Sequence, residues 1–282
     1  MVRSFTFGAA LPALGHSLSS RTWKLKASNA RTGFRGTTVA MLGLAIVFAP
    51  VAGVKAAELK VLAGSSMTDS LREIAPQFER ITGHNLVFLF AGTPELIRQA
   101  TSGAPFDLGV VPVDVMKDAA ARARFAAGPT IDISRVGYGV AFKSGVPKPD
   151  VGTPDAMKAA LLHAKSVTLY PESAAGAYVM KTFERLGIGE AMKAKTRPQP
   201  PGQIAAAVAK GDADLAVFLT NLLIAPGVEL AGPFPAELQN ELVFVGAVAA
   251  DSKEADAAKA FIAYLKTPEA AAVFKAKGVT PG

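Results

Sequence analysis

Short apolar runs alternate with amphipathic segments along the chain after residue 57. Three of these runs are typical of buried strands: "LKVLA" (59–63), "NLVFLFA" (85–91) and "FDLGVVP" (106–112). After the first run, apolar residues recur at helical spacing from Leu71 to Phe78, with charged residues between them. Pro76 lies inside that predicted helix and is expected to kink it, because proline removes a backbone hydrogen bond. The alternation predicts an α/β fold with parallel strands.

The second half of the chain continues this alternation. Further strands are predicted at 135–145, in "KSVTLYPE" (165–172) and in "ELVFVGAVAA" (241–250). Helices are predicted from about Val113 to Ala126, in "TPDAMKAALLHA" (153–164) and in "SAAGAYVMKTFERLGI" (173–188). The residues after 56 are numerous enough for two α/β lobes, with boundaries near 134–140 and 220–232.

Charge is distributed unevenly along the chain. The formal net charge is +7, yet residues 1–56 hold seven basic residues and no acidic one. The remaining residues carry 23 Lys and Arg against 23 Asp and Glu, so they are formally neutral. The basic character therefore belongs to the first segment, and the sequence predicts no nucleic-acid partner.

The first 56 residues have the layout of an export signal. A basic stretch ends at Arg35, an uncharged apolar run follows from Val39 to Ala49, and small residues fill "VAGVKAAE". This layout predicts cleavage after Ala56. The alternative is a retained membrane anchor, because the 19 residues from Gly36 to Val54 carry no charge. Both interpretations predict that the rest of the chain is exported.

The residue types present give little support to an enzyme. The chain has no cysteine, which excludes disulfides and thiolate metal sites. His84 and His163 are the only histidines after residue 56, and each stands alone in the sequence. No nucleophile elbow, phosphate-binding loop or dinucleotide-binding glycine pattern occurs. The sequence therefore predicts a protein that is not an enzyme and has no cofactor and no metal site.

Ser65 and Ser66 stand at the junction between the first strand and the helix after it. The first turn of a helix has backbone N–H groups without partners. Ser66 followed by Asp69 matches a loose capping box, which would satisfy these groups locally. The same N–H groups and the hydroxyl could instead bind an anion. Both interpretations remain open at this point.

Two further junctions resemble the first one. Thr93 follows the second strand and precedes Pro94, and "PESAAGAY" (171–178) follows a later strand. Ligands of α/β proteins gather at the carboxyl ends of parallel strands. Three junctions of this kind make a cleft for an anion more plausible than one junction would.

Four segments together resemble the substrate-binding proteins of molybdate and tungstate ABC importers, a class of periplasmic binding protein. These segments are "KVLAGSSMTDSLREIAPQFER" (60–80), "FAGTPELIRQATSGAPFDLGV" (90–110), "YPESAAGAY" (170–178) and "FIAYLKTPEAAAVFKAKG" (261–278). The resemblance implies a two-lobed α/β fold of type II, in which each lobe is a mixed sheet flanked by helices and the ligand cleft lies between the lobes. It implies lobe 1 at 57–137 and 226–282, and lobe 2 at 138–225.

The resemblance also implies a set of ligand-binding residues. Its two hydroxyl positions fall on Ser66 and Thr93, and a backbone N–H donor falls on Ala175; Ser65 is a further candidate. The sequence departs from the family pattern in lobe 2.

At the fourth ligand position, where the family has a backbone N–H, this chain has Pro201, which has none. Leu219 stands where the family has a tyrosine. Gly202 is a candidate replacement donor.

These observations predict an exported, periplasmic solute-binding protein of an ABC importer. It would act as a monomer, capture a small oxyanion such as molybdate or tungstate, and deliver it to an inner-membrane permease. One alternative is a divergent binding protein for an organic acid or another small solute. A second alternative is an exported enzyme or a sensor that reuses the fold.

Overall fold

The structure is a computed structural model that describes residues 56–282. The chain divides into two units, residues 1–51 and 52–282, and the described residues all belong to the second. The predicted export signal and its alternative as an anchor fall almost wholly outside the described residues. Within residues 56–282, no helix combines the length and the apolar character that a membrane crossing requires.

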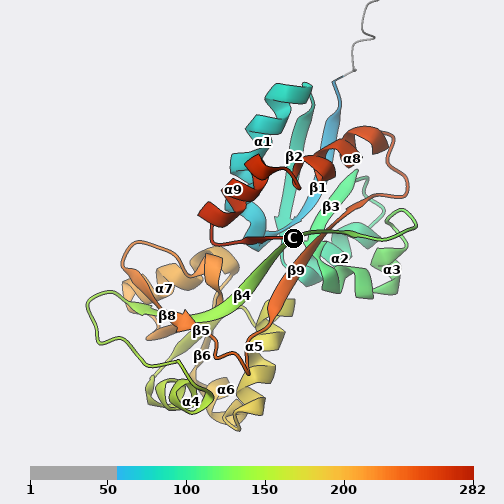
Figure 1. Ribbon diagram of the computed structural model, residues 1–282. Helices are drawn as coiled ribbons and strands as arrows, with labels where there is room; N and C mark the ends of the chain where they lie inside the picture. Colours follow the sequence, from blue (N-terminus) through green and yellow to red (C-terminus); the bar gives the residue numbers. More distant parts are fainter. Residues whose placement is uncertain (1–55) are drawn as a thin grey trace, which may run out of the picture. The chain divides into compact units, whose positions relative to one another are not determined.

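The first lobe is built on three parallel strands with β1 in the centre (Figure 1). These strands are β1 (Glu58–Gly64), β2 (Asn85–Ala91) and β3 (Leu108–Pro112). The helices of this lobe are α1 (Thr68–Thr82), α2 (Thr93–Thr101), α3 (Ala119–Arg122), α8 (Ala255–Tyr264) and α9 (Pro268–Ala276). Pro76 lies inside α1, as the sequence predicts.

Two long strands connect this lobe to the second one (Figure 1). They are β4 (Ile131–Lys143) and β9 (Glu241–Val248), and they pair with each other in antiparallel fashion up to Gly137. From Tyr138 onward β4 pairs instead with strands of the second sheet. The short strand β10 (Thr280–Pro281) adds to β4 in the first sheet. One continuous strand thus belongs to both sheets.

The second lobe repeats the parallel arrangement. Its strands are β5 (Val167–Leu169), β6 (Thr196–Pro198), β7 (Leu215–Leu219) and β8 (Val228–Pro233). β5 is parallel to both β6 and β7, whereas β7 and β8 run antiparallel to β4. Its helices are α4 (Pro154–His163), α5 (Ala174–Arg185), α6 (Gly189–Lys195) and α7 (Ile204–Lys210). The α/β fold with two lobes is therefore confirmed.

Two details of the predicted layout need correction. The continuous helix from about Val113 to Ala126 is wrong, because Asp118 adopts an extended conformation and its carboxylate accepts a hydrogen bond from the N–H of Ala121. This cap separates a 3₁₀ turn, η2 (Val113–Lys117), from the four-residue helix α3. The second segment of lobe 1 begins later than the predicted residue 226, because β8 still pairs with β4 in the second sheet.

Close packing and buried aromatic rings mark the point where β4 changes sheets. Tyr138 is almost fully buried, and its ring lies 4.7 Å from that of Tyr178. Burial raises the pKa of the Tyr138 phenol far above its ordinary value, so this phenol stays neutral at physiological pH. A Cβ atom on Gly139 would lie 2.9 Å from the carbonyl oxygen of Gly232. The crossing therefore requires a residue without a side chain at this position.

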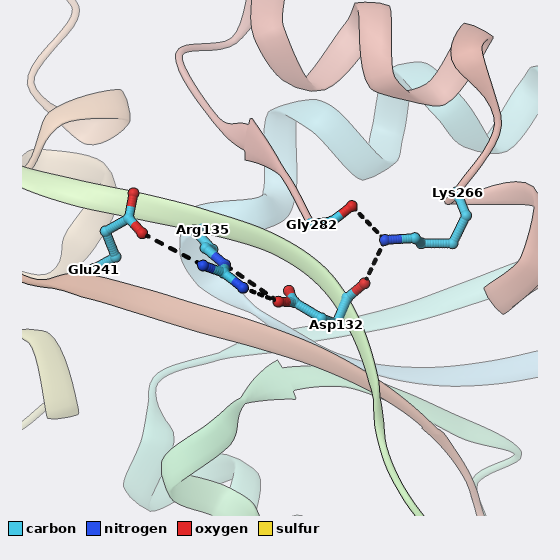
Figure 2. A network of polar contacts seen from close by, with 5 residues as sticks. All are labelled: Asp132, Arg135, Glu241, Lys266 and Gly282. Carbon is cyan, nitrogen blue, oxygen red and sulfur yellow. Dashed lines mark hydrogen bonds and ion pairs between the residues drawn. The ribbon is translucent and has the colours of Figure 1, made fainter.

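A polar network ties the crossing strands to the end of the first lobe (Figure 2). The guanidinium of Arg135 on β4 donates to the Asp132 carboxylate at 2.5 and 3.1 Å and lies 3.9 Å from the carboxylate of Glu241 on β9. The Lys266 ammonium donates to the carbonyl oxygens of Asp132, at 2.8 Å, and of Gly282. The side chains are partly exposed, so the network positions the strands more than it stabilises them.

Removing an aromatic ring from the core of the first lobe should destabilise the protein strongly. Phe261 is fully buried and contacts Phe78, with ring centroids 5.0 Å apart. Phe261→Ala is expected to lower the free energy of unfolding by about 3–5 kcal/mol, because it leaves a cavity. Circular dichroism during urea denaturation suits this measurement, since the only tryptophan, Trp23, lies outside the described residues. Lys259→Ala, on the exposed face of α8, is the control, and equal losses in both variants would contradict the expectation.

Candidate functional site

The carboxyl ends of the parallel strands of both lobes meet at one small cavity. β1, β2 and β3 end there from the first lobe, and the segments after β5, β6 and β7 reach it from the second. Its volume is about 20 Å³. Its lining is Gly64, Ser65, Ser66, Ala91, Gly92, Thr93, Pro112, Ser173, Ala175, Pro201, Phe218, Leu219, Leu222, Leu242 and Phe244. Four of the five predicted ligand-binding residues thus lie together here: Ser65, Ser66, Thr93 and Ala175.

The first junction does not form the capping box that its sequence allows. Ser65, Ser66 and Met67 form a 3₁₀ turn, η1, and neither η1 nor α1 has a side-chain cap. The hydroxyl of Thr68, not that of Ser66, bonds back to the Ser65 carbonyl oxygen, at 2.7 Å. Ser66 is buried, and its hydroxyl has no hydrogen-bond partner within residues 56–282. This hydroxyl is therefore free to bind a ligand.

The second junction leaves another hydroxyl free. Thr93 is the first residue of α2, and the preceding Gly92 provides no side-chain cap. The Thr93 side chain is buried at the cavity and makes no hydrogen bond to the described part of the chain. Pro94 follows it and has no N–H to satisfy. The ring of Tyr170, from the other lobe, packs so closely that a Cβ atom on Gly92 would lie 3.1 Å from it.

The third junction is capped, and the cap leaves backbone donors free. The Ser173 hydroxyl accepts a hydrogen bond from the N–H of Gly176 at 3.0 Å and donates to the carbonyl oxygen of Tyr170. The N–H groups of Ala174 and Ala175, in the first turn of α5, have no partner among residues 56–282. The hydroxyl therefore serves the helix here, and the Ala175 N–H at the cavity is the available donor.

The remaining second-lobe positions are mainly apolar. Pro201 lines the cavity from the 3₁₀ turn η3 (Pro201–Gln203), and Leu219 and Leu222 line it from the end of β7 onward. Gly202 is exposed and lies outside the lining, because the turn presents Pro201 to the cavity. Gly202, the predicted replacement donor, therefore does not lie with the other candidate residues at the cavity.

No lining residue carries a charged side chain. The polar groups at the cavity are hydroxyls and backbone N–H groups at the starts of α1, α2 and α5. The N-terminus of a helix carries a partial positive charge and attracts anions. The site is therefore suited to hold a small anion with neutral donors, and it lacks a side chain that could transfer protons near neutral pH.

Sequence reasoning missed the residues that reach the cavity from distant parts of the chain. Leu242 and Phe244 come from β9, and their place beside Ser66 depends on strand pairing that no local pattern shows. Gly64 could have been identified from the sequence, because it is a glycine at the end of a predicted strand. A Cβ atom there would lie 2.5 Å from the Phe244 ring, so the ring can approach only a glycine.

The histidines and the acidic residues have structural roles or stand apart from the cavity. His84 is buried, and its Nδ1 accepts a hydrogen bond from the N–H of Ala57. Asp107 accepts hydrogen bonds from the Lys60 N–H and from the Ser252 hydroxyl. No group of three or more potential metal ligands occurs within the described residues.

Two wider grooves, of about 760 and 840 Å³, flank the segment around Lys148 and Asp150 on the second lobe. They lie outside the meeting point of the strand ends. The first turn of α4 borders the second groove through Ala156, whereas the starts of α1, α2 and α5 line neither groove. The candidate site is therefore distinguished by the convergence of strand ends and helix starts, and not by its size.

Comparisons with known proteins identify the family and the fold. The sequence profile of the family described as "Bacterial extracellular solute-binding protein" matches residues 59–280. The aconitate isomerase of Pseudomonas sp. is 30% identical over 230 residues, which cover 79% of this chain and 87% of that protein. The molybdate-binding protein of Escherichia coli (strain K12) is 30% identical over 246 residues, which cover 84% and 95% of the two chains.

The solved structure of the periplasmic molybdate-binding protein of Azotobacter vinelandii has the same fold. It superposes with a TM-score of 0.66 at 20% sequence identity, covering 79% of this chain and 98% of that one.

Gly176→Ala should disrupt the third junction. A Cβ atom at this position would lie 1.8 Å from the carbonyl oxygen of Tyr170, so the start of α5 must move. We expect a loss of about 1–3 kcal/mol in the free energy of unfolding, the usual range for overpacking, together with weaker ligand binding. Gly202→Ala is the matched control, because a Cβ atom there meets no atom within 4 Å. Thermal and chemical unfolding of both variants would check this, and an unaffected Gly176→Ala protein would contradict it.

Proposed function

This chain belongs to the bacterial extracellular solute-binding proteins, and from that premise we propose that it captures a small oxyanion, of the molybdate or tungstate type, between its lobes. In this proposal the protein is exported to the periplasm after cleavage of the leader at residue 56. It acts as a monomer and delivers the anion to an inner-membrane ABC permease. Lobe 1 comprises residues 57–137 and the segment after β8, and lobe 2 comprises the residues between them.

This proposal rests on how the first turns of α1, α2 and α5 are capped. The hydroxyls of Ser66 and Thr93 are left free by uncapped helices, whereas the Ser173 hydroxyl is used as a cap and leaves the Ala175 N–H free. Ser66 and Thr93 are largely buried and line the cavity, and their hydroxyl oxygens are not among the fully buried polar atoms without a partner, so these hydroxyls are open to the cavity. A ligand oxygen that accepts from all three groups would satisfy them together.

Neutral donors suit a ligand that must be released again. Hydrogen bonds to a charged group contribute about 1.5–3 kcal/mol each, so three to five of them give useful affinity without a buried ion pair. The narrow cavity favours a compact ligand of few heavy atoms. Pro201 offers no N–H and Leu219 no hydroxyl, so we expect fewer donors from the second lobe than the molybdate-binding family provides.

Binding or conversion of an organic acid is the second candidate. It is favoured by the 30% identity to an aconitate isomerase and by the apolar lining from Pro201, Leu219 and Leu222. An isomerisation that moves a proton between carbon atoms would need a general base close to the substrate. The lining residues provide no such base, which supports oxyanion binding over isomerisation.

Calorimetric titration should separate the ligand classes. We expect saturable one-to-one binding of molybdate or tungstate, weaker binding of sulfate and phosphate, and no binding of aconitate. Competition by excess aconitate, or heat only with aconitate, would contradict the oxyanion proposal in favour of the second candidate. An assay that follows the isomerisation of added aconitate at high protein concentration completes this comparison. Turnover of aconitate in this assay would overturn the non-enzymatic role.

The hydroxyl donors should matter individually. Ser66→Ala and Thr93→Ala are each expected to weaken oxyanion binding by about 10- to 150-fold, the equivalent of one hydrogen bond to a charged group. Ser102→Ala removes a hydroxyl from the exposed end of α2 and should leave the affinity unchanged. Equal affinity in all three variants would show that the anion binds elsewhere.

A further inference from the structure

One side chain of the second lobe bonds directly to the turn that carries Ser66. Asn221 lies in the 3₁₀ turn η4 (Thr220–Leu222), which follows β7. Its Nδ2 donates to the carbonyl oxygen of Ser66 at 2.7 Å, across 155 positions of sequence. The bond therefore joins the helix start of one lobe to the strand end of the other.

The surroundings of η4 link it to the hinge as well. The Thr220 hydroxyl donates to the carbonyl oxygen of Gly137, at 3.3 Å, where β4 leaves the first sheet. On the other side, a Cβ atom on Gly278 would lie 3.7 Å from the Cβ of Asn221 and 3.5 Å from the Cδ1 of Ile224. The turn thus bonds to the crossing strand and to the Ser66 turn, and it lies near Gly278 at the end of the first lobe.

We propose that Asn221 is a positioning residue that couples the angle between the lobes to the presentation of Ser66 to the ligand. This inference rests on the proposed function of the same cavity. A hydrogen bond tolerates only small changes of distance and angle, so the bond persists over a narrow range of lobe orientations. Where it forms, it fixes the Ser66 peptide group and favours the closed arrangement of the lobes.

Asn221 does not act as a ligand donor in this arrangement. One of the two N–H groups of its side-chain amide donates to the Ser66 carbonyl oxygen, and Asn221 is absent from the cavity lining. Its Oδ1 is buried and has no partner among residues 56–282. A buried acceptor without a partner destabilises the folded state. Removing the side chain therefore loses one hydrogen bond and also relieves that cost, and we expect little change in the melting temperature.

The kinetics of ligand release provide the first test. Asn221→Ala should accelerate dissociation of the bound oxyanion by about 3- to 10-fold, the effect of one neutral hydrogen bond, and leave the association rate nearly unchanged. Asn240→Ala is the matched control, because it removes the same side chain from an exposed position. Stopped-flow mixing with molybdate or tungstate measures both rates. Dissociation from Asn221→Ala at the wild-type rate, with an unchanged melting temperature, would overturn the proposal.

A conformational readout separates this inference from the proposed function. Because the chain has no cysteine, fluorophores can be attached at two introduced cysteines, Arg80→Cys on α1 and Lys181→Cys on α5, both at exposed positions. We expect Asn221→Ala to shift the interlobe distance distribution toward the open form, relative to the wild-type and Asn240→Ala proteins. Identical distributions in the three proteins would overturn the coupling.

Failure of the proposed oxyanion binding can be distinguished from failure of the proposed role of Asn221. A wild-type protein that binds no oxyanion would contradict the proposed function, and the ligand-free distance distributions would still decide whether Asn221 sets the lobe angle.

Discussion

A single strand, β4, hydrogen-bonds in two sheets, and the rest of the architecture depends on it. Up to Gly137 it pairs with β9, and from Tyr138 it pairs with β7 and β8. Because β4 is continuous, the carboxyl ends of the parallel strands in both lobes face one another across a small space. Helix starts from both lobes then converge there without any need for a charged side chain. The cavity is thus a consequence of the strand pairing, and its chemistry follows from the residues at the strand ends.

Capping and ligand binding use the same unpaired backbone groups, and the three junctions divide these roles differently. At α5 the Ser173 hydroxyl satisfies one N–H group, and the Ala175 N–H is left at the cavity. At α1 and α2 no side chain caps the helix, and the hydroxyls of Ser66 and Thr93 remain free. An uncapped helix start costs about 0.5–2 kcal/mol of stability. A bound anion can recover this cost, which links the stability of the first lobe to occupancy of the site.

Local sequence patterns predict most of the fold and the first-lobe half of the candidate site. The strands β1, β2 and β3 and the positions of Ser66 and Thr93 follow from apolar runs that end in glycine and hydroxyl residues. The broken helix after β3 was not predicted, because helical composition there conceals the single cap at Asp118.

Features that depend on contacts across the chain could not be predicted. The edge strand β8, the approach of Phe244 to Gly64 and the bond from Asn221 to Ser66 each join distant segments. These three contacts are stabilised by packing that exists only after the sheets have assembled. The lobe boundary was misplaced for the same reason, since only its pairing with β4 assigns β8 to the second lobe.

The two halves of the cavity are chemically unequal, and this inequality bears on how the ligand is held. The first lobe offers hydroxyls that include those of Ser66 and Thr93, whereas Pro201, Leu219 and Leu222 make much of the second-lobe surface apolar. A ligand would therefore bind first to the first lobe, and closure would add the Ala175 N–H and exclude water. Exclusion of water strengthens each remaining hydrogen bond, because the local dielectric constant falls. A second lobe with few donors can thus contribute to affinity mainly by closing, and an interlobe bond such as that from Asn221 to Ser66 then gains importance relative to direct ligand contacts.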